Sequence, residues 1–336
     1  MRRVPGPPVL IASYSGVLGG AERVLLDCAT RLSRPVTVAC PEGPLAAELR
    51  AAAVAHVPIR SRPLQLSPAH GAHLLGLTRD LRRLDPGFVV AWGARAVLAT
   101  ALAGRPWLAV HHDLLGGPVL TATRIATRRA RRVAAASHAI AGQFAGNPVV
   151  LHPGVDLARF TPQPLSEGPP HAVVIGALVG WKRPGLALEI ATLMPELRLT
   201  LAGATLPGDD GAFEAELRAR ARPLGDRVTI GPVADVRAAL ATAHVVLHCA
   251  DAEPYGMALV EGLAAGRPVV APAAAGPLEI VSAGAGRLYP PGNAPAAVEA
   301  LRAVLADAAA PAAARRHAET SFDVNASVAR LEALLP

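Results

Sequence analysis

Short apolar segments alternate with amphipathic segments along the whole chain of 336 residues. The apolar segments are residues 8–12, 36–39, 88–91, 107–110 and 149–151, then 172–175, 197–201, 227–230, 244–247 and 268–271. Helical spacing of apolar residues occupies the intervals, for example residues 21–32, 74–84, 185–193, 212–222 and 233–241. Apolar strands that alternate with helices are typical of parallel sheets covered on both faces. The pattern therefore predicts an α/β protein.

The segment 161–170 (TPQPLSEGPP) interrupts this alternation, because it is rich in Pro, Ser and Gly and has no periodicity. Such a composition is typical of a linker. We therefore expect two Rossmann-like domains, residues 1–160 and 171–316, with parallel sheets facing across a cleft. Ala-rich helical patterns at 295–308 and 312–319 precede an amphipathic stretch with Val324, Val328, Leu331, Leu334 and Leu335. This predicts a C-terminal amphipathic helix within 317–336 that docks on either domain and can cross back to the N-terminal one.

Composition narrows the class of protein. Hydrophobic residues make up 51% and charged residues 18%, which is enough apolar material for buried cores. The apolar runs are shorter than the roughly 18 to 20 residues that span a bilayer. Residues 9–12 after Arg2 and Arg3 are too short for the apolar part of a signal peptide. Cys28, Cys40 and Cys249 have no metal or disulfide spacing. We expect a soluble cytoplasmic protein with reduced thiols.

The net charge of +7 suggests an anionic partner. The types of the basic residues single out one position. All but one of the 33 basic residues are arginine, and the exception is Lys182. It lies in the loop 176–184 (GALVGWKRP), after a predicted strand. A compact ammonium beside glycines at this edge of a sheet suits a point contact to phosphate. Ligands of parallel sheets bind beyond the carboxyl ends of the strands.

Two other loops follow strands in the same way. The glycines of residues 13–20 (SYSGVLGG) let the backbone approach a ligand at a predicted helix start. The segment does not fit the dinucleotide-binding pattern GxGxxG, which excludes a dinucleotide-dependent oxidoreductase. Residues 251–266 contain Gly256 at a predicted helix start and Gly266 at its end. The amides of Gly256, Met257 and Ala258 would face a diphosphate. Glu253 and Glu261 are costly in so apolar a segment unless they meet donors such as sugar hydroxyls.

Glu253 and Glu261 form a Glu-x7-Glu pair inside EPYGMALVEGLAAGRPVVAP, which resembles the donor-site motif of retaining GT-B glycosyltransferases, in particular carbohydrate-active family 4. Four further segments resemble the same family in the same order, which extends the resemblance to nearly the whole chain. They are GGAER at 19–23, VHHDLLGG at 110–117, HPGVDLARF at 152–160 and AGPLEIV at 275–281, and GWKRP carries the lysine.

The resemblance implies roles for individual residues. Lys182 would stabilise the leaving diphosphate, Glu253 would contact the transferred sugar, and Glu261 would bind the ribose hydroxyls. The amides of Gly256, Met257 and Ala258 would hold phosphate and sugar. Gly19 and Gly20 would approach the donor from the N-terminal domain. His112 would lie near the transferred sugar, although the match to His111 or His112 is open by one position. The family has an arginine where this chain has Ala177, and Arg183 is the candidate to replace it at the donor.

The resemblance also implies the reaction: transfer of a sugar from a nucleoside-diphosphate sugar to an acceptor hydroxyl with retention. No Asp-x-Asp occurs in the sequence, and a lysine and helix N-termini stabilise a leaving diphosphate without a metal, so we expect neither cofactor nor metal. The alternative is a non-catalytic relative that binds a sugar nucleotide or a partner, which the Ala177 departure allows. The donor base, the sugar and the acceptor stay open.

Three further features of the sequence bear on membrane, metal and nucleic-acid binding. Arginines cluster at positions 124, 128, 129, 131 and 132, and Arg124, Arg128 and either Arg131 or Arg132 would share one helical face. Such a face is either solvated, or it contacts an anionic membrane or a lipid-phosphate acceptor. His244, His248 and Cys249 have a spacing that one strand face can share, but a third separate metal ligand is not apparent. Nucleic-acid binding is disfavoured because the basic stretches lack interleaved aromatic residues.

Overall fold

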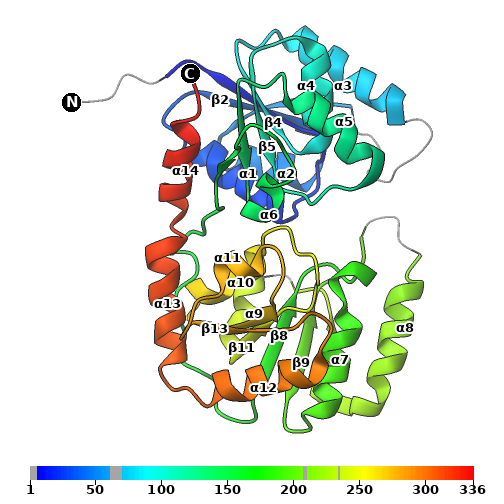
Figure 1. The fold of residues 1–336 in the computed structure, drawn as a ribbon, viewed down its shortest axis with the longest axis vertical. Coiled ribbons are helices and arrows are strands. Elements are labelled where there is room, and N and C mark those ends of the chain that lie inside the picture. Colours follow the sequence, from blue (N-terminus) through cyan, green and yellow to red (C-terminus); the bar gives the residue numbers. More distant parts are fainter. Residues whose placement is uncertain (1–5, 61–69, 207–209, 234) are drawn as a thin grey trace. The chain divides into compact units, whose positions relative to one another are not determined.

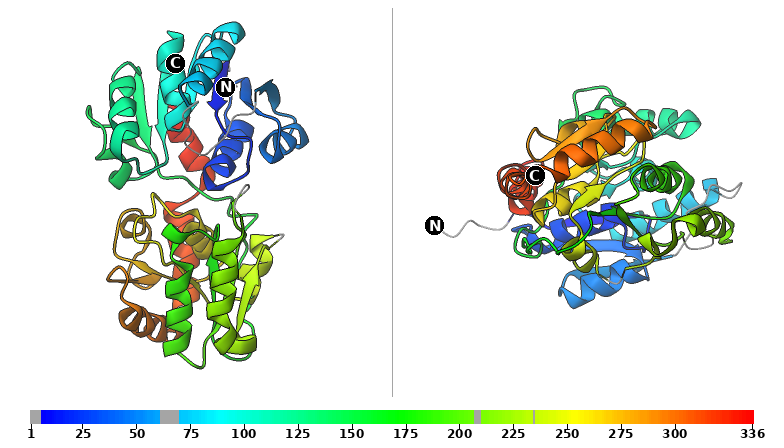
Figure 2. Two further views of the ribbon diagram at one scale, coloured as in Figure 1. Left: turned by 90° about the vertical axis from the view of Figure 1, so that its right-hand side faces the viewer. Right: turned by 90° about the horizontal axis from the view of Figure 1, so that it is seen from below.

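The computed structural model describes residues 6–60, 70–206, 210–233 and 235–336. The chain forms two compact units, residues 1–154 together with 324–336, and residues 155–323. Each unit is a parallel sheet with helices on both faces (Figure 1, Figure 2). The predicted α/β class with two Rossmann-like domains is confirmed.

The first unit contains a seven-stranded sheet in the order β3-β2-β1-β4-β5-β6-β7, and its strand pairs are parallel. The strands are β1 Val9–Ser13, β2 Val36–Pro41, β3 Ala55–Ile59, β4 Val89–Trp92, β5 Trp107–His111, β6 Arg132–Ala135 and β7 Val149–Val150. The helices are α1 Gly20–Arg31, α2 Pro44–Ala51, α3 His70–Leu84, α4 Ala94–Ala103, α5 Gly117–Thr127, α6 His138–Ala141 and α14 Val324–Glu332. The strand order reverses between β1 and β4, which is where a ligand binds in such sheets.

The second unit contains a six-stranded parallel sheet in the order β10-β9-β8-β11-β12-β13. Its strands are β8 His171–Ile175, β9 Arg198–Ala202, β10 Val228–Gly231, β11 Val245–Leu247, β12 Val269–Pro272 and β13 Gly286–Tyr289. The α-helices are α7 Pro184–Leu193, α8 Ala212–Ala221, α9 Val236–Thr242, α10 Met257–Ala264, α11 Pro277–Ile280, α12 Ala294–Leu305 and α13 Ala310–Ser321, and short 3-10 segments span Gly180–Lys182 and Arg222–Arg227. Here the strand order reverses between β8 and β11.

The C-terminal stretch belongs to the first unit, as the amphipathic pattern allowed. Val324, Val328, Leu331, Leu334 and Leu335 are all buried in the core that α1 and α2 also form. Figure 1 shows α14 beside α1, with which it packs. The amphipathic helix expected within 317–336 is α14, and residues 317–321 belong to the preceding helix α13, which ends at Ser321. The carbonyl of Phe322 accepts a hydrogen bond from the Val155 amide, at 2.8 Å, which interrupts helical pairing before α14 begins.

The segment 161–170 is irregular, as a linker would be, but it lies inside the second unit. The chain passes between units at Gly154 and Val155, and again at Asp323 and Val324. Segment 161–170 is bound to its own unit by the Arg267 guanidinium, which donates to Pro164 O, and by the Ser166 hydroxyl, which donates to Thr242 O.

The basic segment 124–132 is not one helix. Helix α5 ends at Thr127, and the amides of Arg129 and Ala130 donate to the carbonyls of Ala126 and Thr127 in a tight turn. The turn is required because β6 pairs in parallel with β5 from Arg132 onward. The arginines of this segment are exposed, but they do not share a helical face.

In the described part of the chain, none of the helices has both the length and the apolar content to cross a bilayer. Cys28, Cys40 and Cys249 are buried free thiols.

Candidate functional site

The loop between β8 and α7 holds Lys182 at the carboxyl end of the sheet. Gly176 follows the strand with φ +144°, and a Cβ on Gly203 would lie 1.8 Å from the Gly176 carbonyl oxygen, so two glycines are needed for this close backbone approach. A 3-10 turn, Gly180–Lys182, then leads to Arg183 in the left-handed region, φ +51°. Helix α7 begins at Pro184, a residue suited to the first helical position.

The loop between β11 and α10 brings the second group of predicted residues to the same edge. Gly256 has φ +120°, a conformation that favours glycine, and α10 begins directly after it at Met257. Gly266 has φ +69° just beyond the helix, as the sequence predicted. The first amides of a helix have no carbonyl four residues earlier within it, so those of Met257 and Ala258 are available to an anion at this end.

Lys182 and Glu253, which are 71 residues apart in sequence, form an ion pair. Lys182 Nζ donates to Glu253 Oε2 at 2.5 Å, with side-chain exposures of 21% and 10%. The ammonium also lies over the Trp181 ring, 4.5 Å from its centroid. Because β8 and β11 are neighbours at the point where strand order reverses, these two loops are adjacent. The structure thus joins two of the three residues that were predicted to be catalytic.

His248 completes the surroundings of Glu253. Its ring is buried, and Nε2 lies 3.2 Å from Glu253 Oε2 but makes no well-formed hydrogen bond there. Burial alone would raise the pKa of the Glu253 carboxyl. The contact with His248 and the charge of Lys182 outweigh burial and hold that pKa at about 2. Glu253 is therefore a buried carboxylate that stays ionised at neutral pH.

Arg183 is directed to a different carboxylate. Its guanidinium donates to Asp251 Oδ2, while Asp251 Oδ1 is buried without a hydrogen-bond partner. Ala177, at the place of the family's arginine, is half-buried and brings no cation. Arg183 adds a positive charge to the same loop as Lys182, so the unit carries two cations and two carboxylates at this edge.

Glu261 lies on α10, one turn after Met257 and Ala258, and is half-buried. The structure therefore places it on the helix whose N-terminus follows Glu253, as the sequence predicted. The ribose contact expected of Glu261 stays a prediction.

In the first unit, the glycine-containing loop after β1 leads directly into helix α1, whose N-cap is Gly19. The Gly19 amide donates to Glu22 Oε2 at 3.2 Å, and Gly20 begins α1 and is exposed. Gly16 is packed closely, because a Cβ there would lie 2.8 Å from the Pro41 carbonyl oxygen. Part of the glycine content thus serves packing, and Gly20 remains accessible at the helix N-terminus.

The two histidines that the sequence could not separate occupy different environments. His111 ends β5, is buried, stacks on Phe144 and shares a 3.1 Å hydrogen bond with Thr127. Burial, with a smaller effect of His112, lowers the pKa of His111 to about 3. His112 follows the strand and lies against Gly93, where a Cβ would be 2.9 Å from its Nε2. His111 is a core residue, which leaves His112 as the histidine of the loop.

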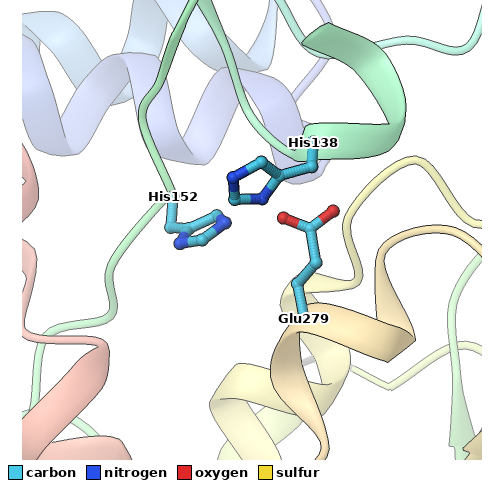
Figure 3. A group of neighbouring side chains, drawn as sticks. All are labelled: His138, His152 and Glu279. Atoms are coloured by element: carbon cyan, nitrogen blue, oxygen red, sulfur yellow. The ribbon is translucent and has the colours of Figure 1, made fainter. Parts of the chain in front are cut away.

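A second pair of histidines lies near the end of β7. His138 begins α6 and His152 follows β7, with ring centroids 5.7 Å apart (Figure 3). The Ser327 hydroxyl of α14 donates to the His152 carbonyl at 2.8 Å. Figure 3 also labels Glu279, which comes from α11 in the second unit.

His244 and His248 do not form the metal pair that their spacing suggested. His244 Nδ1 accepts from the His171 amide at 3.1 Å, and its Nε2 contacts Ser166 O at 2.9 Å, so both ring nitrogens are used. His248 instead contacts Glu253. Sequence reasoning missed this role and that of Asp251. The available signal was a histidine directly after an apolar strand and five residues before the loop glutamate.

Curated relatives match part of this chain. D-inositol 3-phosphate glycosyltransferases of Mycobacterium sp. (strain KMS) and Mycolicibacterium gilvum are each 35% identical to it over 142 residues. The match covers 38% of this chain and 32% of each relative, so it spans about a third of their length.

Solved structures resemble the whole fold. Anabaena HepE, solved in complex with UDP-glucose, has a TM-score of 0.83 at 24% identity, covering 98% of this chain and 100% of that one. Sucrose-phosphate synthase from Thermosynechococcus elongatus has a TM-score of 0.83 at 18% identity, covering 97% and 98%. At these identities the likeness establishes the GT-B fold alone.

Two sequence families match adjoining parts of the chain. Residues 18–159 match Glycosyltransferase Family 4, and residues 158–321 match Glycosyl transferases group 1. The matches meet near the boundary between the two units and together extend over both sheets. The chain therefore belongs to the group 1 glycosyltransferases of family 4.

Proposed function

We propose that this chain transfers a sugar from a nucleoside-diphosphate sugar to an acceptor hydroxyl, with retention of anomeric configuration and without a metal. The observation that carries the proposal is the pairing of Lys182 with the buried Glu253 beside the N-terminus of α10. A cation, an ionised carboxylate and amides at a helix N-terminus are the groups that a diphosphate and a sugar need.

In this proposal the second unit binds the donor. Lys182 and the amides of Gly256, Met257 and Ala258 face the diphosphate, Glu253 accepts hydrogen bonds from the sugar hydroxyls, and Glu261 accepts from the ribose. Arg183, held by Asp251, adds positive charge to the Lys182 loop in place of an arginine at Ala177. Gly20 and His112 of the first unit supply the remaining contacts to the donor.

The proposed reaction breaks the bond between the anomeric carbon and the diphosphate oxygen, which leaves with the electron pair. The acceptor oxygen forms the new bond on the same face of the sugar, and its proton passes to the departing phosphate oxygen. Charge that develops on the diphosphate is stabilised by Lys182 and the helix amides, the kind of preorganised contribution that is usually large in catalysis. The metal-free reaction is supported by these charges and by the lack of Asp-x-Asp in the sequence.

UDP-glucose is the first donor to test, because a GT-B structure of similar fold was solved with it. A cytoplasmic location is part of the proposal, supported by the three free thiols. The exposed arginines of 124–132 give the first unit a basic surface, so an acceptor with a lipid phosphate and contact with an anionic membrane are also proposed.

A second candidate is a non-catalytic relative that binds a sugar nucleotide or a partner. Ala177 favours it, because this chain lacks the arginine that the family has at that position. The two candidates differ in turnover, since only a catalyst releases free nucleoside diphosphate when an acceptor is present.

A thermal-shift screen tests donor binding. Purified protein is heated with UDP-, GDP-, ADP- and dTDP-sugars, with Lys182→Ala and Glu261→Ala alongside. A ligand that binds only the native state raises the melting temperature, by RT ln(1 + [L]/Kd) in free energy. We expect a rise with one nucleotide class that is smaller in both variants. Equal rises in wild type and Lys182→Ala would place the nucleotide elsewhere.

A further inference from the structure

The backbone of His248 is hydrogen-bonded on both sides to buried parts of the second unit. Its backbone amide donates to Val270 O at 2.8 Å, and its carbonyl accepts from the buried Tyr289 hydroxyl at 2.7 Å. The ring itself is 4% exposed. The imidazole is therefore a buried neighbour of Glu253 on a hydrogen-bonded backbone.

Glu253 Oε2 is shared unequally between two neighbours. Lys182 Nζ donates to it at 2.5 Å, whereas His248 Nε2, at 3.2 Å, makes no well-formed hydrogen bond and has no other partner. Lys182 lies on the more exposed side, at 21%, compared with 4% for His248. Lys182 is thus the partner that can leave, and His248 the one that remains.

Donor binding would separate Lys182 from Glu253. A diphosphate carries more charge than one carboxylate and attracts the ammonium more strongly at equal distance. Glu253 would then be a buried carboxylate without its main donor, and an ionised group left in that state is costly. The only remaining nitrogen within 4.0 Å among the described charged side chains is His248 Nε2.

We propose that His248 is a positioning residue that takes over Glu253 from Lys182 when the donor binds. In the free chain Lys182 and Glu253 neutralise one another. With donor bound, Lys182 contacts the diphosphate, and His248 donates from Nε2 to Glu253 and aims the carboxylate at the sugar. This inference rests on the proposed function, of which it supplies one step.

The first test needs no donor, because Lys182→Ala removes the same partner that a diphosphate would remove. His248→Leu is compared in wild type and in Lys182→Ala by urea unfolding. We expect His248→Leu to raise the equilibrium constant of unfolding about 10-fold more in the Lys182→Ala background than in wild type, as a lost hydrogen bond to a buried charge implies. Equal effects in both backgrounds would overturn the proposal, even if no donor were ever found.

The second test measures how His248 affects the binding of ligands that carry a diphosphate. Calorimetric Kd values for UDP and for UDP-glucose are measured with wild type, His248→Leu, His248→Gln and Glu253→Gln. We expect His248→Leu to weaken UDP and UDP-glucose about 10-fold each, because both ligands carry the diphosphate that draws Lys182 away from Glu253. His248→Gln keeps a donor at the same place and should recover most of the difference.

Two results of the second test would contradict the role of His248. One is an unchanged Kd for UDP, because its diphosphate alone should draw Lys182 away and leave Glu253 to His248. The other is additivity of His248→Leu and Glu253→Gln, because residues that act through one another are not additive. Failure of wild type to bind either ligand would count against UDP as the nucleotide, while the unfolding comparison would still decide the role of His248.

Discussion

Acid should destabilise the second unit through Glu253. The folded-state pKa of this carboxyl, about 2, is below its ordinary value of 4.5, because His248 and Lys182 outweigh the opposing effect of burial. A carboxyl with a lowered pKa contributes stability above its unfolded pKa, and that contribution is lost as the pH falls through the folded value. The relevant window therefore runs from about pH 5 down to pH 2.

The size of the effect follows from the pKa difference. One pKa unit is worth about 1.4 kcal/mol, so a fall from 4.5 to about 2 corresponds to about 3 kcal/mol of stability at neutral pH. About 2 kcal/mol of this is already lost at pH 3, because the unfolded chain is then mostly protonated at this position. Solvent screens the charge interactions of Glu253 only weakly, since this residue is 8% exposed.

The assay is the free energy of unfolding by urea between pH 7 and pH 3, with hydrogen exchange at the β11 amides to report on this unit. Glu253→Gln cannot titrate at this position, so its stability should fall less with acid than that of wild type, by about 2 kcal/mol at pH 3. Glu216→Gln, an exposed change on α8, is the control and should follow wild type. Parallel curves for wild type and Glu253→Gln would refute the reasoning.

Two further predictions concern packing. Gly203→Ala should destabilise the second unit by about 1 to 3 kcal/mol or more, because its Cβ would lie 1.8 Å from the Gly176 carbonyl oxygen. Gly231→Ala, with open space around its Cβ, is the control, and a shared loss in urea unfolding would contradict the geometry. Leu331→Ala should cost the first unit about 2 to 5 kcal/mol, because Leu331 is fully buried in α14. The exposed Arg330→Ala should change little, and equal effects of the two in denaturant titrations would argue against docking of α14 in the core.

The parts of the fold that were predicted from sequence are those with strong local patterns. Strands such as β8, which is apolar after His171 because helices cover both faces of the sheet, were evident from the sequence. The apolar stripe from Val324 to Leu335, through which α14 packs on the core, was evident as well. Strand β3 was missed because Pro58 and exposed Ala55 weaken the pattern at the sheet edge. Strand β6 was missed because its first residue, Arg132, continues a run of arginines.

The site was predicted as separate loops, and only folding joined them. Lys182 was singled out by being the only lysine, and Glu253 by its apolar surroundings, but their direct pairing depends on β8 and β11 being neighbours. His248 was noted with His244 for a spacing that one strand face can share, and a metal site was set aside because a third ligand was not apparent. Ring orientation decides such a case, and it is set by tertiary hydrogen bonds such as that of His244 to Ser166.

The central claim is that this site releases a nucleoside diphosphate from a sugar donor with the help of Lys182. The most direct measurement is acceptor-dependent release of nucleoside diphosphate from the donor found by thermal shift, using acceptors fractionated from cell extract. The account predicts release by wild type and, at saturating donor, a rate at least about 100-fold lower for Lys182→Ala. This is the scale of losing one group that stabilises the transition state. Equal rates in wild type and Lys182→Ala, or donor binding without any acceptor-dependent release, would contradict it.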